Sequence, residues 1–157
     1  MTIQVDTREK SRAIQKIIKE FDRQGVTHFS SKLYVGDYVN LENSFLVVDR
    51  KQNLLEVCSN VCQQHKRFVD EIKRANAAGI KIVFLVEHSK NINSLDDVKD
   101  WNNPRLKESP LAVSGERLYK ILSTLEKKYG VEFQFCDKQN TGKRIIEILN
   151  MKNTAST

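Results

Sequence analysis

The chain has 157 residues, with 29% charged and 8% aromatic side chains, which is ordinary for a soluble globular protein with one core. Its formal net charge of +6 favours a polyanion such as nucleic acid as a partner. The chain has no apolar run near the ~18 residues of a membrane span, no signal peptide and only three cysteines, which excludes a disulfide framework, so we expect a cytoplasmic protein without a membrane partner.

The first third of the chain predicts a strand, a helix and one ambiguous stretch. Ile3-Gln4-Val5 is typical of a short strand, with Asp6 at its carboxyl end. Apolar residues at three- and four-residue spacing then predict a helix from about Ser11 to Gly25. The stretch 26–33 is ambiguous, and a strand with a polar face is one interpretation.

The stretch 34–51 predicts a hairpin in which an apolar strand ends abruptly in charges. Residues 45–48 are apolar on both faces, which indicates an interior strand, and Asp49-Arg50-Lys51 follow at once. A hairpin loop over 41–44, centred on Asn43, places Asp37 directly opposite Asp49. Lys51 falls on the same face because side chains alternate along a strand.

Two carboxylates and an ammonium at one point are consistent with two interpretations. The carboxylates repel each other, so the arrangement makes most sense around a bound divalent cation. Charges at a strand end are also common in water, and the charge pattern alone favours an ordinary surface ion pair between Asp49 and Lys51.

Residues 53–78 predict the longest helix. Its expected buried face comprises Leu54, Cys58, Val61, His65, Phe68, Ile72 and Ala75. A polar stripe on the other side either faces solvent or borders the centre near Lys51; it comprises Glu56, Asn60, Gln63 and Arg67. Cys58, Cys62 and His65 have a spacing compatible with zinc, but they continue the apolar stripe, so we assign them to the core.

Residues 81–157 predict further strands and helices of the same domain. Residues 81–87 form an apolar strand parallel to the first, which implies a crossover and a helix-covered sheet. A long polar excursion follows over 88–110, with a helix start at 94–97; its Trp101 either anchors the loop or, with Arg105, contacts nucleic acid. Further expected elements are a helix with Ser114 as N-cap, a strand over 131–136, a helix over 141–149 and a frayed tail over 151–157.

Three motifs in this order resemble the XPF-type structure-specific endonuclease domain, a branch of the PD-(D/E)XK nuclease superfamily. Gly36-Asp37 followed by Asp49-Arg50-Lys51 is similar to its GD…(E/D)RK signature, and residues 5–9 match its opening V-D-x-R-E. Arg67-Phe68, Glu71 and Ala75, followed by the strand 82–87, resemble the helix and strand that come next. The resemblance covers roughly residues 3–87.

The resemblance implies a single nuclease domain over 1–150 with an α/β, restriction-endonuclease-like fold, in which helices flank both faces of a central mixed sheet. It implies Mg²⁺- or Mn²⁺-dependent hydrolysis of DNA, with the ion held by Asp37, Asp49 and the backbone carbonyl of Arg50. Lys51 would position or deprotonate the attacking water and hold the scissile phosphate. Asp6 and Glu9 would complete the acidic shell. The expected phosphate and DNA contacts are Arg8, Arg50, Arg67, Arg105, Lys143 and Arg144, the last two also being explained by a solvated basic helix end.

The chain departs from the family pattern at one position that matters. The usual E-R-K-x-x-x-D places an aspartate where this chain has Leu55, with Glu56 next to it. Leu55 favours a rival hypothesis, a catalytically inactive DNA-binding or scaffold domain, and an RNA-directed nuclease is a third. We expect a stand-alone version, bacterial or phage-like, without a helix-hairpin-helix pair. Selection of branched or forked DNA would then depend on the core, the 88–110 excursion, or a partner, either a second copy or another protein.

Overall fold

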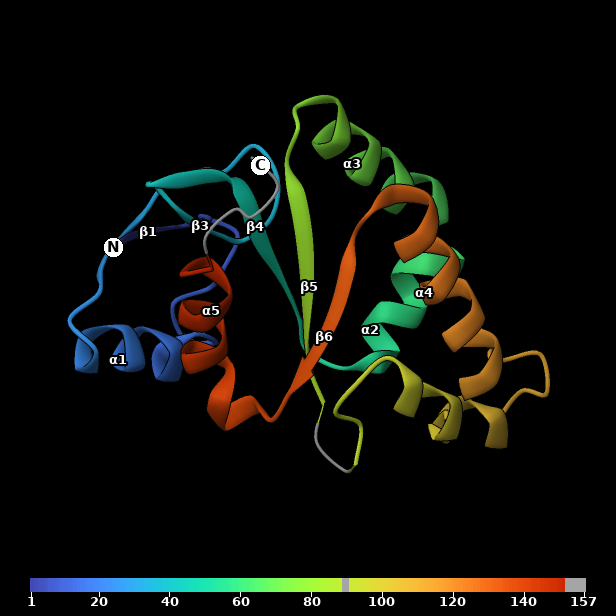
Figure 1. Ribbon diagram of the computed structural model, residues 1–157. Helices are drawn as coiled ribbons and strands as arrows, with labels where there is room; N and C mark the ends of the chain where they lie inside the picture. Colours follow the sequence, from blue (N-terminus) through green and yellow to red (C-terminus); the bar gives the residue numbers. More distant parts are fainter. Residues whose placement is uncertain (89–90, 152–157) are drawn as a thin grey trace.

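The computed structural model describes residues 1–88 and 91–151, which form a six-stranded mixed sheet with the order β2-β1-β3-β4-β5-β6 (Figure 1). β1 and β2 are parallel, β3 is antiparallel to both β1 and β4, and β4, β5 and β6 are parallel. The strands are β1 (Thr2–Val5), β2 (Thr27–Ser30), β3 (Tyr38–Asn40), β4 (Asn43–Lys51), β5 (Lys81–Glu87) and β6 (Glu132–Cys136).

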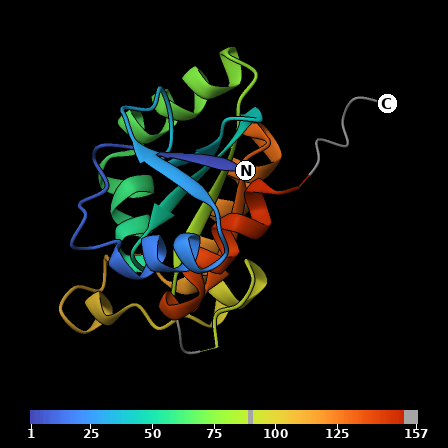
Figure 2. The same ribbon diagram turned by 90° about the vertical axis from the view of Figure 1, so that its left-hand side faces the viewer.

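Helices cover both faces of this sheet, as Figures 1 and 2 show. One layer comprises α1 (Gln15–Arg23) and α5 (Thr141–Leu149), which pack against each other. The other layer comprises α2 (Leu54–Cys58), α3 (His65–Ala77) and α4 (Gly115–Tyr129). The predicted fold class, a central mixed sheet with helices on both faces, is therefore confirmed.

The alternation of side chains along the strands divides the core into two clusters. In β5, Ile82, Phe84 and Val86 face α2, α3 and α4, whereas Val83 and Leu85 face α1 and α5. All five are buried, which explains why this strand is apolar on both faces. β4 is also interior, as predicted, and its last three residues are the charged Asp49, Arg50 and Lys51.

The predicted hairpin forms, but its loop is shorter than expected. The turn contains only Leu41 and Glu42, because Asn43 already pairs with Asn40 as the first residue of β4. The register shifts between Val39 and Asn40, and beyond the shift Tyr38 pairs with Val48. One more step along the strands brings Asp37 beside Asp49, which is the expected pairing.

The single helix predicted over 53–78 is wrong, because a π-helical turn (Ser59–Gln63) separates α2 from α3. Such a turn inserts extra residues into the helix and rotates the face that follows. Cys62 and His65 are consequently exposed, so their assignment to the core is wrong, whereas Cys58 is half-buried against the core. Within residues 1–88 and 91–151, no three His, Cys, Asp or Glu side chains are grouped to hold a metal ion.

The remaining elements follow the prediction with shifted boundaries. The ambiguous stretch contains β2, and the first helix begins at Gln15 after a turn. The excursion contains 3₁₀ helices over Asp96–Asp100 and Pro104–Lys107, and Trp101 anchors it, being only 9% exposed. Ser114 caps α4, as expected. Most of the predicted tail, 152–157, lies outside the described residues, and no described helix is long and apolar enough to cross a membrane.

Candidate active site

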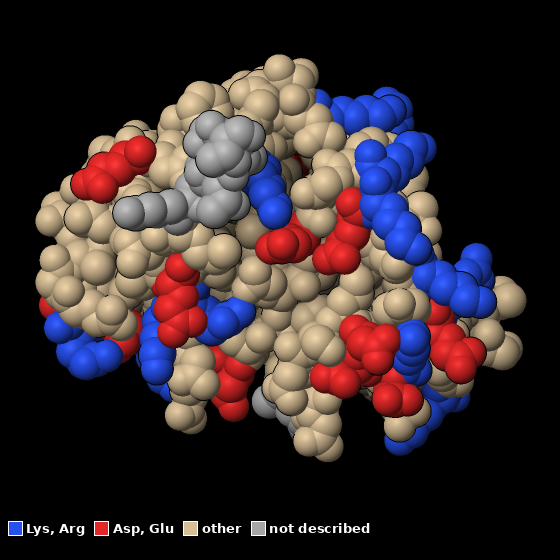
Figure 3. All heavy atoms as spheres, viewed as in Figure 1, with Lys and Arg blue, Asp and Glu red and all other residues tan. Residues whose placement is uncertain are grey.

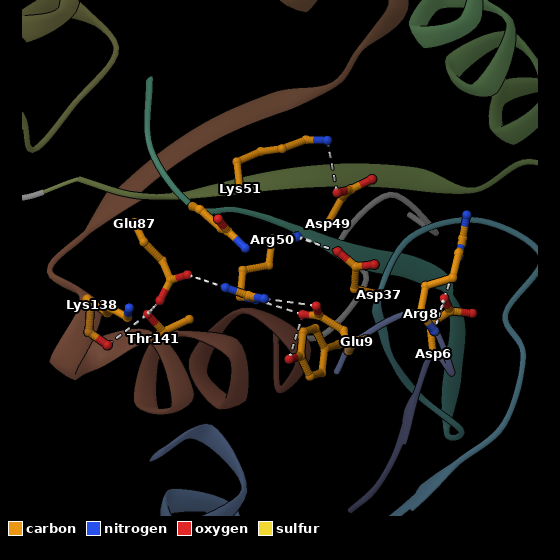
Figure 4. Close-up of polar contacts among 12 residues, drawn as sticks. Asp6, Arg8, Glu9, Asp37, Asp49, Arg50, Lys51, Glu87, Lys138 and Thr141 are labelled. Atoms are coloured by element: carbon orange, nitrogen blue, oxygen red, sulfur yellow. Dashed lines mark hydrogen bonds and ion pairs between the residues drawn. The ribbon is translucent and has the colours of Figure 1, made fainter. Parts of the chain in front are cut away.

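A cleft of about 230 Å³ lies at the carboxyl end of β4 and is lined by five acidic and three basic side chains. Figure 4 shows six of these eight, from Arg8 and Glu9 to Lys51. This local excess of negative charge occurs in a chain whose formal net charge is +6. The cleft therefore favours a cation over a bare phosphate group. Its lining residues are Arg8, Glu9, Asp37, Asp49, Arg50, Lys51, Gln52, Glu56 and Glu71.

Asp37 is held beside Asp49 by backbone contacts with β4. Gly36 precedes it with φ +77°, and a Cβ at Gly36 would lie 2.9 Å from the Val47 side chain, so this approach to β4 requires glycine. The Asp37 N–H donates to the Val48 carbonyl, and the Arg50 N–H donates to the Asp37 carboxylate, both at 2.8 Å. Sequence and backbone geometry thus fix the first carboxylate of the site.

The electrostatic state of Asp37 indicates a site suited to a cation. Burial raises the pKa of Asp37 well above its ordinary value, and the nearby charges of Asp49 and Glu9 raise it further. A divalent cation between the two carboxylates would relieve this repulsion. Two carboxylates and a carbonyl are hard oxygen donors, and Mg²⁺ is commonly bound by one or two carboxylates plus water, so the donor set fits such an ion.

Lys51 lies on the same side as the two aspartates, as the alternation of β4 predicts. Its Nζ is 3.4 Å from Asp49 Oδ1 and lies 5.7 and 5.8 Å from the ring centroids of Phe68 and Phe84. Burial alone would lower the pKa of Lys51, but Asp49 and other acidic groups outweigh it, so this pKa is raised. Lys51 is therefore a fixed positive charge at the edge of an acidic cleft.

The side chain of Arg50 points away from solvent into a buried ion-pair network. Its guanidinium binds both carboxylate oxygens of Glu9, at 2.7 and 2.9 Å, and one oxygen of Glu87, at 2.5 Å. The Tyr38 hydroxyl donates to Glu9 at 2.8 Å. The side chains of Arg50, Glu9 and Glu87 are 5%, 10% and 3% exposed. Arg50 is therefore engaged by protein carboxylates and not directed toward a substrate phosphate.

Asp6, expected in the acidic shell, lies outside the set of residues that line the cleft. Its carboxylate is fully buried and accepts hydrogen bonds from the backbone N–H of Leu33 at 2.7 Å and from Arg8 Nε at 2.5 Å. Burial would raise the pKa of Asp6, but these hydrogen bonds outweigh it and lower the pKa. Asp6 thus joins the loop after β2 to Arg8, whose side chain reaches the cleft and is 60% exposed.

Three further glutamates lie around the centre. Glu56 belongs to the polar stripe for which a position beside the centre was one interpretation, whereas Glu71 and Glu87 were not among the predicted site residues. Glu71 enters the cleft from α3, and burial followed by the charge of Asp49 raises its pKa. Glu87 ends β5 in the same manner as Asp49 ends β4, by a charge after an apolar strand, and this signal could have found it. Glu56 accepts a hydrogen bond from the Gln52 N–H at 3.2 Å and helps to cap α2 while lining the cleft. Leu55 is 38% exposed beside it.

A second and larger cleft, of about 740 Å³, adjoins the first and shares Arg8 and Glu71 with it. It follows the first turns of α3 and includes Arg67, one of the predicted DNA contacts. Its other lining residues are Gln63, Gln64, Lys66, Asp70 and Arg74. In the view of Figure 3, Lys and Arg side chains also gather at the right, over α3 and α4.

The other predicted DNA contacts are not brought to the acidic cleft. Arg105 lines a separate cleft of about 210 Å³, which meets the α3 cleft at Gln63. Lys143 and Arg144 lie on α5, in the helical layer opposite α3 (Figure 1). Arg144 is bonded to Gln134 and Glu147, at 2.5 and 3.3 Å. Which side of a sheet a helix covers depends on tertiary packing, so the sequence pattern did not predict that Lys143 and Arg144 lie away from the acidic cleft.

Comparison with known proteins finds one matching family and two solved structures with a similar fold. The family model for the ERCC4 domain matches residues 5–149. Two solved structures of XPF from Aeropyrum pernix are similar: one with TM-score 0.61 and 20% identity over 95% of this chain, the other, in complex with DNA, with TM-score 0.65 and 19% identity over 94%. The chain spans about 60% of the length of each, 60% and 62% respectively. No curated protein sequence matches the chain.

Proposed function

Because the chain belongs to the ERCC4 domain family, we propose that it is an endonuclease that hydrolyses DNA phosphodiester bonds with Mg²⁺ or Mn²⁺. The observation that carries the proposal is the meeting of Asp37, Asp49 and Lys51 in one cleft that is negative within a positively charged chain. A surface ion pair, the other interpretation of this charge pattern, is less consistent with side chains that are only 12% exposed for Lys51 and 9% for Asp49.

The hydrolysis of a phosphodiester is slow because anionic oxygens repel a nucleophile and because the leaving alkoxide is poor. Asp37 and Asp49, with the Arg50 carbonyl as a further ligand, would hold the divalent ion, which offsets charge on a phosphoryl oxygen and acidifies a water molecule when bound. The Arg50 N–H keeps the Asp37 carboxylate oriented, so the site is organised before substrate arrives.

Lys51 supplies a second positive charge to the reacting phosphate. Its ammonium is compact, is held near Asp49, and is confined by the two aromatic rings beneath it. We propose that Lys51 donates hydrogen bonds to the scissile phosphate and to the attacking water. This role uses the charged form of Lys51, which its surroundings favour.

The cleft along α3 is the proposed path of the DNA backbone into the acidic cleft. Arg8 belongs to both clefts, and Lys66, Arg67 and Arg74 add exposed positive charge beside it. Basic side chains of this kind bind phosphates without reading sequence. The similar XPF structure in complex with DNA supports DNA as the substrate. Preference for branched or forked DNA, and a second copy or another protein as partner, extend this proposal.

The rival proposal is a catalytically inactive domain that binds DNA through the same surface. It is favoured by Leu55, which leaves the family's additional acidic position without a carboxylate. Glu56 and Glu71 both bring carboxylates to the cleft from elsewhere, which favours the active alternative.

The discriminating experiment incubates the protein with single-stranded, duplex, forked and four-way DNA, and with single-stranded RNA, in Mg²⁺, Mn²⁺ or EDTA. We expect DNA cleavage with either metal and none in EDTA. Asp49→Asn should abolish cleavage and leave DNA binding intact or stronger, because one negative charge is removed. Asp100→Asn, at an exposed carboxylate outside the cleft, is the matched control and should cut normally.

Cleavage that survives EDTA, or that is unaffected by Asp49→Asn, would refute the metal-site proposal. Retained DNA binding without turnover on any substrate would establish the inactive rival. A preference for RNA over every DNA structure would overturn the assignment of substrate.

A further inference from the structure

Glu87 lies outside the residues that line the acidic cleft, yet its charged side chain is buried, with only 3% of it exposed. Each of its carboxylate oxygens has a partner. Oε1 accepts from Arg50 Nη1 at 2.5 Å, and Oε2 lies 2.7 Å from the Thr141 hydroxyl. A buried carboxylate that is fully partnered in this way holds both of its partners in place.

These contacts form a continuous path from α5 to the proposed metal site, visible in Figure 4. Thr141 is the first residue of α5 and is fully buried. Its hydroxyl lies 2.7 Å from Glu87 and 3.1 Å from the Lys138 carbonyl, and the shorter contact makes Glu87 the main acceptor of its single hydrogen. Glu87 binds the guanidinium of Arg50, and the backbone N–H of Arg50 donates to Asp37 at 2.8 Å. Thus α5, on the sheet face opposite α3, is linked to the acidic cleft through the side chains of Glu87 and Arg50 and the backbone N–H of Arg50.

The balance of the network depends on Glu87 as well as on Glu9. Glu9 binds Nε and Nη2 of Arg50, and Glu87 binds Nη1. Loss of Glu87 would leave a buried guanidinium donor without a partner, which is costly in a desolvated position. The guanidinium would then turn toward other acceptors. The Asp37 carboxylate is one such acceptor, because it already accepts a hydrogen bond from the backbone N–H of Arg50.

We propose that Glu87 and Thr141 are positioning residues of the metal site: they fix Arg50 so that its backbone N–H holds the Asp37 carboxylate in its ligating orientation. The inference rests on the proposed function, because it concerns the ligands of the proposed ion. Neither residue touches DNA or the ion. Groups that orient metal ligands in this indirect way commonly change metal affinity 10- to 100-fold when they are removed.

The test is the dissociation constant for Mn²⁺, measured by titration calorimetry on the full chain without DNA. We expect Glu87→Gln to weaken Mn²⁺ binding by ~10-fold or more. Thr141→Val, which removes only the hydroxyl, should weaken it by about 5-fold, the equivalent of one hydrogen bond. Thr141→Ser retains the hydroxyl and should bind Mn²⁺ as the wild type does. Thr124→Val is the matched control, because Thr124 is exposed on α4 and its hydroxyl donates to the Lys120 carbonyl.

A kinetic measurement separates positioning from general destabilisation. In Glu87→Gln and Thr141→Val, kcat at low Mn²⁺ should fall and should recover as Mn²⁺ is raised, while KM for DNA changes less than about 2-fold. A merely structural role would lower the active fraction at every Mn²⁺ concentration. If Glu87→Gln fails to fold, the comparison of Thr141→Val with Thr141→Ser carries the test.

Wild-type Mn²⁺ affinity in both Glu87→Gln and Thr141→Val would overturn the inference and leave the proposed function standing. Failure of the wild-type chain to bind Mn²⁺ at all would overturn both. Weaker binding in Thr141→Ser, equal to that in Thr141→Val, would also contradict the inference, because the hydroxyl would then not be the relevant group.

Discussion

Two adjoining clefts share Arg8 and Glu71 and differ in almost every other respect. The smaller is built at strand ends, where five acidic side chains outnumber three basic ones and backbone hydrogen bonds fix the groups. The larger is built along α3, where four basic side chains outnumber two acidic ones. Several of its members project into solvent; Lys66, for example, is 94% exposed.

The difference suggests separate roles for the buried charges at the strand ends and the exposed charges on α3. Buried charges interact strongly because little water screens them, so the strand ends suit an ion that must be held in one position. Exposed charges on a helix act weakly one by one and depend on salt, which suits attraction of a long polyanion. If this separation is correct, changes in the acidic cleft should affect catalysis, and changes along α3 should affect affinity.

The largest expected effect comes from Lys51, whose ammonium lies beside Asp49 in the acidic cleft. Lys51→Met keeps an unbranched side chain over Phe68 and Phe84, shortened by one atom, and removes its charge. We expect kcat to fall about 100- to 1,000-fold, as for removal of one preorganised donor at a reacting oxyanion. DNA affinity should change less than about 3-fold, because the exposed surface is intact. Lys19→Met on α1 serves as control, and an unchanged kcat in Lys51→Met would break the proposed division.

The next effect concerns Asp6, which anchors Arg8, one of the two residues that both clefts share. Asp6→Asn replaces one acceptor oxygen by a donor beside the N–H groups of Leu33 and Arg8, so we expect a loss of about 1–3 kcal/mol in the free energy of unfolding. The lowered pKa of Asp6 means that its carboxylate stabilises the fold above pH ~4 and loses this contribution as the pH falls through its folded-state pKa.

Urea unfolding measured at several pH values checks the Asp6 prediction. The difference between wild type and Asp6→Asn should be full near neutral pH and should shrink as the solution is made acidic. Asp100→Asn, at an exposed carboxylate, provides the control. A difference that grows on acidification would contradict the assigned role of Asp6.

The smallest expected effect concerns the basic side chains along α3, and it tests whether the larger cleft affects DNA affinity without affecting kcat. Lys66→Glu combined with Arg67→Glu should weaken DNA binding about 10-fold at moderate salt and reduce the salt slope of log K by about two. At saturating DNA and Mn²⁺, kcat should stay near the wild-type value. The control is the same double reversal at Lys16 and Lys19 of α1, on the opposite helical layer. Equal losses in both double variants would show that only net charge matters.

The sequence predicted the family, the fold class and the central pair of aspartates, because each depends on motifs and strand pairings between residues close together in the chain. Motifs over residues 3–87 carried the resemblance, and the family match now extends over residues 5–149. Asp37 and Asp49 could be paired because a short hairpin has few registers, and the register shift at Asn40 preserved this pairing although the loop was shorter than expected.

Features that depend on tertiary packing could not be predicted in the same way. The π-helical turn Ser59–Gln63 contains neither proline nor glycine, so no breaker signal marks it. The separation of Lys143 and Arg144 from the acidic cleft depends on which face of the sheet α5 covers. The partners of Arg50 come from Glu9 and Glu87, which lie 41 and 37 residues away, and no periodicity relates such positions.

The most direct test of the account is the anomalous scattering of Mn²⁺ in crystals of the wild-type chain soaked with MnCl₂. We predict a peak between the carboxylates of Asp37 and Asp49, within ligand distance of both and of the Arg50 carbonyl. The absence of a peak in the acidic cleft while Mn²⁺ supports cleavage in solution, or a peak at another group of side chains, would contradict the central claim.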